Sequence, residues 1–228
     1  MIPDPDAPPI NPLPVVVWML ALPVIAIEAV FSLGARGIVG GPGAVGWRMA
    51  AFQDYAVSGQ VLEWMLSNGR YPPEHLLRFV IYPFVHVSFT HALFVIVFIL
   101  ALGKMVGEVF RAWAVLAVFF GSAIVGGLVY GGVLNDPAPL VGGYPAVYGL
   151  IGAFTFLLWM RLGATGDNQY RAFTLIGFLL GIQLLFGLLF GASNDWVADL
   201  AGFVTGFLLS FVVSPGGWGN VRRRLRHR

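Results

Sequence analysis

The chain has 228 residues, of which 58% are hydrophobic and only 11% are charged, and its formal net charge is +2. A soluble domain carries about 25% charged residues, so this chain is too apolar to cover a water-facing surface. The absence of cysteine excludes disulfides and thiolate chemistry. The composition therefore indicates a membrane protein, and no nucleic-acid partner is expected.

Six apolar stretches approach the roughly 20 residues that a helix needs to cross a bilayer. They are Val15–Leu33, Phe79–Gly103, Ala112–Leu134, Tyr144–Trp159, Phe173–Phe190 and Trp196–Val213. The fourth is the weakest, because it is short and begins in a glycine-rich loop. The sequence therefore predicts an all-α membrane domain of six helices over residues 15–213.

Three segments are expected outside the bilayer. Residues 1–14 are rich in proline and aspartate, and residues 214–228 form a basic tail. A long loop over residues 35–78 contains a helical-looking stretch, Trp47–Leu66, with few charges, which we expect to enter the headgroup layer. The N-terminus has no basic region ahead of its apolar run, so a signal peptide is not expected.

The positions of the basic residues predict the orientation, because lysine and arginine are retained on the cytoplasmic side. If both termini are cytoplasmic, nine of the thirteen lysine and arginine residues lie on the cytoplasmic side. Two follow the second span, two follow the fourth, and five lie in the tail. They are Lys104, Arg111, Arg161, Arg171, Arg222, Arg223, Arg224, Arg226 and Arg228. We therefore expect a multi-pass protein of a bacterial inner membrane, with both termini inside and a tail that binds anionic lipids.

Three short segments carry the most specific patterns in the chain. The first reads Gly142-Gly143-Tyr144-Pro145-Ala146-Val147-Tyr148-Gly149, and the second reads Ala198-Asp199-Leu200-Ala201-Gly202-Phe203-Val204-Thr205-Gly206. The third lies on the second predicted span and holds Arg78, His86, His91 and Val95.

Together these segments resemble the rhomboid family of intramembrane serine proteases. That family has Gly-x-Ser-Gly on its fourth helix and Ala-His-x-x-Gly-x-x-x-Gly on its sixth, and here Tyr144 stands at the serine position and Asp199 at the histidine position. On its second helix the family has an arginine, two histidines and an asparagine. Arg78, His86 and His91 match the first three, and Val95 replaces the asparagine.

The resemblance implies a rhomboid-like fold in which the catalytic pair has been replaced. A serine hydroxyl needs an adjacent base, and the oxyanion needs aimed donors. Tyr144 carries its hydroxyl on a ring, Pro145 removes a backbone N–H, and Val95 supplies no donor. We therefore expect no catalytic residue, with the remnants of the site at Arg78, His86, His91, Val95, Gly142, Pro145 and Tyr148.

The same resemblance implies how the fourth and sixth helices pack. Gly149 and Gly152 on one helix and Gly202 and Gly206 on the other allow close backbone approach. An aspartate in a membrane helix costs roughly 2.5–3.5 kcal/mol on insertion scales, so Asp199 needs a partner or a proton. The prediction is that Tyr144 and Asp199 are neighbours near the outward face, joined by a direct hydrogen bond or through one water, with His91 nearby.

Several other interpretations remain open at this stage. His86 and His91 could simply contact water at the outward end of their helix, and Ser88 could act as a substitute nucleophile. A metal site of His86, His91 and Asp199 is conceivable, but no metal-specific motif is present, and neither a metal nor a cofactor is expected. Glu28 is expected to face the interface or a polar group of the bundle.

The sequence favours a catalytically inactive rhomboid-like protein that binds, chaperones or helps assemble other membrane proteins through contacts between transmembrane segments. An atypical intramembrane peptidase with an unidentified nucleophile is the alternative. A carrier is disfavoured, because no internal repeat of the kind that transporters use is visible.

Overall fold

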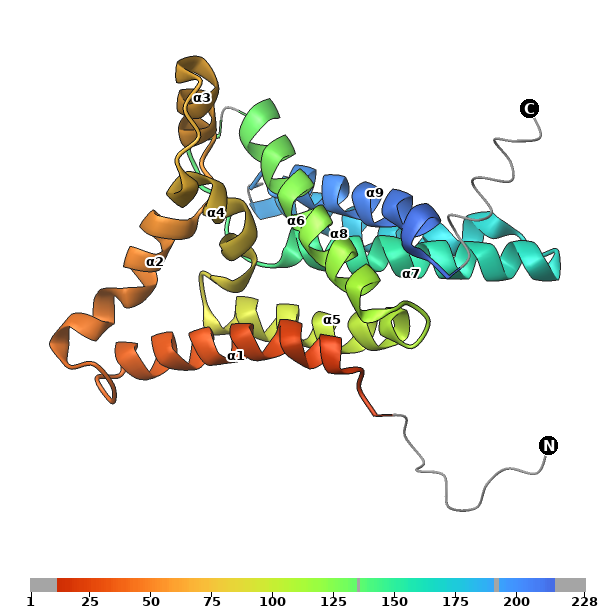
Figure 1. Ribbon diagram of the computed structural model, residues 1–228, viewed down its shortest axis with the longest axis horizontal. Coiled ribbons are helices and arrows are strands. Elements are labelled where there is room, and N and C mark those ends of the chain that lie inside the picture. The colour runs from red at the N-terminus through yellow and green to blue at the C-terminus, as the bar shows by residue number, and fades with distance from the viewer. Residues whose placement is uncertain (1–11, 135, 191–192, 216–228) are drawn as a thin grey trace.

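The computed structural model describes residues 12–134, 136–190 and 193–215, and within these ranges the chain is all-α (Figure 1). The helices are α1 (Val15–Ala35), α2 (Trp47–Tyr55), α3 (Gly59–Asn68), α4 (Pro73–Ile81), α5 (Phe89–Gly107), α6 (Ala112–Val133), α7 (Tyr144–Thr165), α8 (Thr174–Phe190) and α9 (Trp196–Val213). Short 3-10 turns occupy Pro42–Gly46, Tyr82–Phe84 and Gln169–Phe173. Residues 1–11 of the predicted N-terminal segment and 216–228 of the predicted tail lie outside the described residues.

The predicted helical membrane bundle is confirmed in its class, with a difference in the number of long helices. Five helices of the described chain, α1, α5, α6, α7 and α9, are long and apolar enough to cross a membrane. The predicted fifth span corresponds to α8, an apolar helix of 17 residues. This length is below the roughly 20 residues that a straight crossing needs.

Two predicted helix boundaries differ from the structure for local reasons. The second span was expected from Phe79, but α5 begins only at Phe89, because Pro83 cannot continue a helix and Ser88 caps a new one. The Ser88 hydroxyl accepts a hydrogen bond from the backbone N–H of His91 at 3.2 Å. The predicted helical stretch Trp47–Leu66 is divided into α2 and α3 at Val57, which pairs with Leu140 as an isolated bridge.

The contacts between helices fix their relative directions. Gly107 packs on Pro14 and Gly103 on Val17, so α5 runs antiparallel to α1. The α6 helix runs antiparallel to α7, where Gly149 packs against Ser122. It also runs antiparallel to α9 and places Gly121 beside Leu209. The start of α1 and the end of α9 therefore lie on one side of the bundle, while α2, α3 and α4 lie at the opposite end (Figure 1).

The first loop is folded onto the bundle and holds the region where α7 begins. Leu62 of α3 packs on Gly131 of α6. The hydroxyl of Tyr82, after α4, donates to the carbonyl oxygen of Ala123 at 2.7 Å. The carbonyl oxygen of Tyr82 in turn accepts from the backbone N–H of Gly142 at 3.0 Å. These bonds join the loop, α6 and the approach to α7 into one unit.

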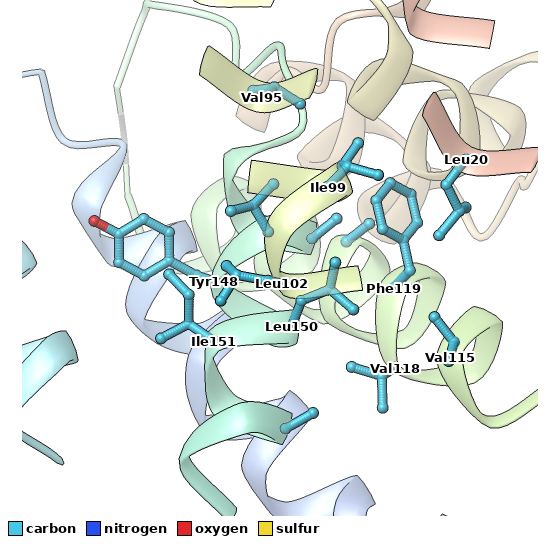
Figure 2. Close-up of a cluster of buried hydrophobic side chains, with 14 of the residues drawn as sticks. Leu20, Val95, Ile99, Leu102, Val115, Val118, Phe119, Tyr148, Leu150 and Ile151 are labelled. Carbon is cyan, nitrogen blue, oxygen red and sulfur yellow. The ribbon is translucent and has the colours of Figure 1, made fainter. Parts of the chain in front are cut away.

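The interior of the bundle is an apolar cluster to which α1, α5, α6 and α7 all contribute. Figure 2 shows Leu20 of α1, Ile99 of α5 and Phe119 of α6 around Leu150 of α7, all of them buried. Tyr148 lies at the edge of the same cluster with its hydroxyl directed away from it (Figure 2). The start of α7 is therefore anchored by apolar packing on one side and leaves polar groups on the other.

The α7 and α9 helices run parallel and meet backbone to backbone. A Cβ atom built on Gly202 would overlap the carbonyl oxygen of Pro145, and one on Gly206 would overlap that of Gly149. A Cβ atom on Gly152 would likewise overlap the carbonyl oxygen of Phe203. Because backbone atoms cannot rotate away as side chains do, only glycine fits these positions, as in other close helix contacts in membranes.

We expect Gly206→Ala to lower the free energy of unfolding by at least the 1–3 kcal/mol typical of overpacking, because the new methyl group meets the backbone of Gly149. The measurement is reversible unfolding in mixed detergent. Gly177→Ala in α8 is the matched control, since nothing lies within 4 Å of its Cβ position. Equal stability of the two variants would contradict the close α7–α9 contact.

Candidate functional site

The residues of the three sequence patterns converge where α7 begins. Tyr144 is the first residue of α7, Gly143 is its N-cap, and Pro145 lies in the first turn, where a missing N–H costs nothing because it has no partner inside the helix. Segment 86–91 approaches from the start of α5, and Asp199 lies in the first turn of α9. The predicted site positions on these three elements are therefore brought to one end of the bundle.

His86 serves as a hydrogen-bond acceptor for the start of α7. Its side chain is 1% exposed, and its Nε2 atom accepts from the backbone N–H of Gly143 at 3.3 Å. Burial, reinforced by the neighbouring His91, lowers the pKa of His86 to about 3, so the imidazole is neutral at physiological pH. The N–H of Gly143 is thus already bonded inside the protein.

His91 and Tyr144 stack ring on ring. Their centroids lie 4.8 Å apart with an interplanar angle of 26°, and the His86 ring meets His91 edge-on at 5.1 Å. Gly142 lies against the His91 ring and has a φ of +98°. A Cβ atom at this position would lie 2.5 Å from His91 Cε1. Glycine is required at this position both for the left-handed backbone and for the close approach.

Val95, predicted from the sequence to stand at an asparagine position, lies against the start of α7. Its side chain is fully buried, and a Cβ atom on Gly143 would lie 2.8 Å from Val95 Cγ1. An apolar side chain therefore packs directly against the N-cap of α7 and brings no hydrogen-bond donor to it.

Asp199 is buried, and its partner comes from α8. Its side chain is 2% exposed, and Oδ2 accepts from Nε2 of Gln183 at 2.9 Å. The Gln183 Oε1 atom accepts from the hydroxyl of Tyr148 at 3.1 Å. The other oxygen of Asp199, Oδ1, has no hydrogen-bond partner in the described chain. One amide thus connects α7, α8 and α9.

The predicted hydrogen bond between Tyr144 and Asp199 is not among those that the structure describes. The ring of Tyr144 packs on His91 instead, and Gln183 supplies the donor that Asp199 needs. Sequence reasoning missed Gln183, although a signal was present. It is the single polar residue of α8 after Thr174, and a polar residue in an otherwise apolar membrane helix usually has a specific partner.

A partly buried ion pair supports the segment that carries His86. Arg48 of α2 binds Glu28 of α1 with two bonds, Nη1 to Oε2 at 2.9 Å and Nη2 to Oε1 at 2.7 Å. The Ser32 hydroxyl donates to Glu28 Oε1 at 2.7 Å. Arg48 Nη1 also donates to the carbonyl oxygen of His86 at 2.6 Å. Glu28 therefore faces a polar partner of the bundle, and the pair fixes the backbone beside the site.

Arg78 lies further from the centre of the site than the two histidines. Its Nη1 donates to the carbonyl oxygen of Ala56 at 2.9 Å, where the chain leaves α2. Arg78 therefore holds the first loop in place rather than pointing at the start of α7.

The other readings of these residues find little geometric support. Within residues 12–134, 136–190 and 193–215, no group of three or more histidine, cysteine or carboxylate side chains is placed to hold a metal ion. Ser88 caps α5 through the backbone of His91. In the same ranges, none of the hydrogen bonds joins a serine or threonine hydroxyl to an imidazole.

The Rhomboid domain family matches residues 73–216, which is well over half of the chain and covers α4 to α9. This chain belongs to the rhomboid family. The resemblance predicted from the three sequence patterns is thereby confirmed, while α1 and the Glu28–Arg48 pair lie before the matched region.

Two relatives extend the comparison. The chain is 29% identical over 206 residues to the putative rhomboid protease YdcA of Bacillus subtilis (strain 168). The aligned region covers 87% of this chain and 88% of that protein. It is 31% identical over 153 residues to the rhomboid-like protease 3 of Toxoplasma gondii, covering 64% of this chain and 56% of that protein. This rhomboid-family chain thus aligns with nearly the whole of YdcA and with about half of the second relative.

The Glu28–Arg48 pair should contribute measurably to stability. We expect Arg48→Met to lower the free energy of unfolding by somewhat less than the roughly 3–5 kcal/mol lost when a fully buried pair is broken, because the Arg48 side chain keeps 23% exposure. In detergent unfolding, the double variant Glu28→Gln/Arg48→Met should lose less free energy of unfolding than the two single variants lose when their losses are added. Arg70→Met, at an exposed position, is the control. Additive losses would contradict a coupled pair.

Proposed function

We propose that this rhomboid-family protein is a pseudoprotease that binds transmembrane segments of other membrane proteins and chaperones or assembles them without cleaving them. The observation that carries the proposal is the stack of Tyr144 on His91 at the position where the family places its serine. Asp199, at the histidine position, is meanwhile paired with Gln183. Neither residue is arranged as a nucleophile with its base.

The requirement for a nucleophile argues against ordinary serine proteolysis. A hydroxyl becomes nucleophilic when a base within hydrogen-bonding reach takes its proton. Tyr144 has its ring packed flat on His91, which does not direct an imidazole nitrogen at the hydroxyl. A phenolate is also a good leaving group, so the ester bond of an acyl-enzyme formed on Tyr144 would break readily and the intermediate would not be stable.

The donors for an oxyanion are also reduced around the start of α7. Pro145 has no N–H, the N–H of Gly143 is donated to His86, and Val95 is apolar. Removing one oxyanion donor from a serine protease costs about 10²–10³ in kcat. Loss of several donors at one place therefore supports binding without hydrolysis.

The surfaces on either side of the site suit a helical partner. The exposed residues of α5 include Leu93, Phe94 and Val97, and those of α8 include Phe178 and Ile182. Large apolar side chains on two membrane helices can pack against a third helix as readily as against lipid. A partner helix beside α5 and α8 would lie next to the polar groups at the start of α7.

The proposal is tested by photo-crosslinking in proteoliposomes with a single-span test protein tagged at both ends. Benzoylphenylalanine at Phe94 or Phe178 should form an adduct that keeps both tags, and the same probe at Leu128 on α6 is the control. Adduct formation no greater at Phe94 and Phe178 than at Leu128 would refute the binding role. Accumulation of fragments carrying one tag would favour the alternative, an atypical intramembrane peptidase.

We further propose that the protein resides in a bacterial inner membrane with both termini in the cytoplasm, where the basic tail meets anionic lipids. The excess of lysine and arginine on that side supports this orientation. The start of α1 and the end of α9 lie on one side of the bundle, which is consistent with it.

The orientation is tested with topology reporters at Gly41 and after the last residue. We expect a periplasm-active phosphatase to work at Gly41 and to be silent at the C-terminus, and a cytoplasm-active reporter to show the reverse. The opposite pattern, or the same side for both fusions, would contradict the proposed orientation.

A further inference from the structure

The buried acceptor at Asp199 is the polar feature of the site that the proposed function leaves unexplained. Asp199 lies in a helix expected in the membrane, and one of its two carboxyl oxygens has no partner in the described chain. Buried polar atoms in proteins are nearly always bonded, so an orphan acceptor calls for an explanation. Leaving a buried acceptor unpaired destabilises the folded state.

Arg48, Arg78 and His86 are bonded to groups other than Asp199, and His91 stacks on Tyr144 with no hydrogen-bond partner for its Nδ1 in the described chain. Arg48 is bound to Glu28 and to the carbonyl oxygen of His86. Arg78 donates to Ala56, and His86 accepts from Gly143 rather than donating to a carboxylate. In the described ranges, no basic group is hydrogen-bonded or ion-paired to Asp199. An ionised Asp199 would thus have no countercharge of its own.

Gln183 is the resident donor for this carboxyl group. Its two bonds, to Tyr148 at 3.1 Å and to Asp199 at 2.9 Å, are the side-chain hydrogen bonds that join α8 to α7 and α9 in the part of the chain that the structure describes. A neutral amide satisfies one oxygen and leaves the charge uncompensated. A cationic donor in its place would form a charge-assisted bond, which is roughly twice as strong as a neutral one.

The depth of Asp199 is compatible with a cation from a partner helix. It is the fourth residue of α9, so it lies about 4.5 Å along the axis from the start of the helix at 1.5 Å per residue. A lysine or arginine one turn from the end of a neighbouring span reaches this depth, and its flexible stem can extend to the headgroups while the span inserts.

We propose that Asp199 recognises a basic side chain near the outward end of the transmembrane segment that this protein binds, and that this side chain displaces Gln183 from the carboxyl group. The inference rests on the proposed function, since it names the chemistry of the bound segment. Charge complementarity decides the class of ligand. In the described chain this buried carboxyl group has one oxygen without a partner and no bonded cation, so it fits a lysine or arginine better than an apolar or acidic residue.

The test uses a designed single-span helix of alanine and leucine with one lysine a turn from its outward end. Three matched helices carry leucine, glutamine or glutamate at that position, and a fourth carries the lysine at the cytoplasmic end. Binding is measured in liposomes by energy transfer between labels on the helix and on the protein. The outward lysine helix should bind about tenfold more tightly than any other, because it alone can form a charge-assisted bond with Asp199.

Two variants of the protein sharpen the test. Asp199→Asn keeps the shape and the acceptor for Gln183 but removes the charge, and it should abolish the preference for lysine. Gln183→Leu removes the competing donor and should increase the ratio of outward-lysine-helix binding to leucine-helix binding. The helix series on the unmodified protein keeps the proposal falsifiable if either variant fails to fold.

The remaining outcomes separate this inference from the proposed function. Equal binding of the lysine and leucine helices would overturn the role of Asp199 and leave the binding function intact. Equal binding of the glutamine and lysine helices, or an unchanged lysine preference in Asp199→Asn, would overturn recognition of charge. Failure of every helix to bind would overturn the proposed function and this inference with it.

Discussion

The close parallel contact between α7 and α9 is the constraint on which the rest of the site depends. Backbone meets backbone at Gly149 and Gly206, and again where Gly202 faces Pro145. This contact sets Asp199 at the level of the first turn of α7, where Tyr144 lies. The identities of Tyr144 and Asp199 therefore decide the chemistry of the site. Under the proposed pseudoprotease role, Tyr144 and Asp199 take the positions of the family's serine and histidine, while the glycines that bring their helices together keep their close contacts.

Several polar groups around this contact are already hydrogen-bonded inside the protein. His86 takes the N–H of Gly143, and its own carbonyl oxygen is held by Arg48, which is bound to Glu28. Asp199 is bonded to Gln183. The same bonds give the site rigidity, because they tie α1, α2 and α8 to the helices that carry it.

The sequence predicted those parts of the fold that depend on spacing along one helix. Glycines four residues apart in α9 predicted a close helix contact, and long apolar runs predicted the spanning helices. It could not predict which side chains meet across helices. Gln183 lies in an apolar run, and nothing in the sequence pairs Arg48 with Glu28. The bond expected between Tyr144 and Asp199 is replaced by the stack of Tyr144 on His91. The start of α5 was misplaced because Pro83 and Ser88 outweigh the continuous apolar composition.

The measurement that tests the central claim most directly is labelling of the purified protein in liposomes with a fluorescent fluorophosphonate, which reacts with activated serines. A soluble serine hydrolase in the same tube shows that the probe is active. The account predicts no saturable labelling of this protein, because Tyr144 and Asp199 stand where the family has its serine and histidine. Saturable labelling that disappears when a single serine is replaced by alanine would contradict it.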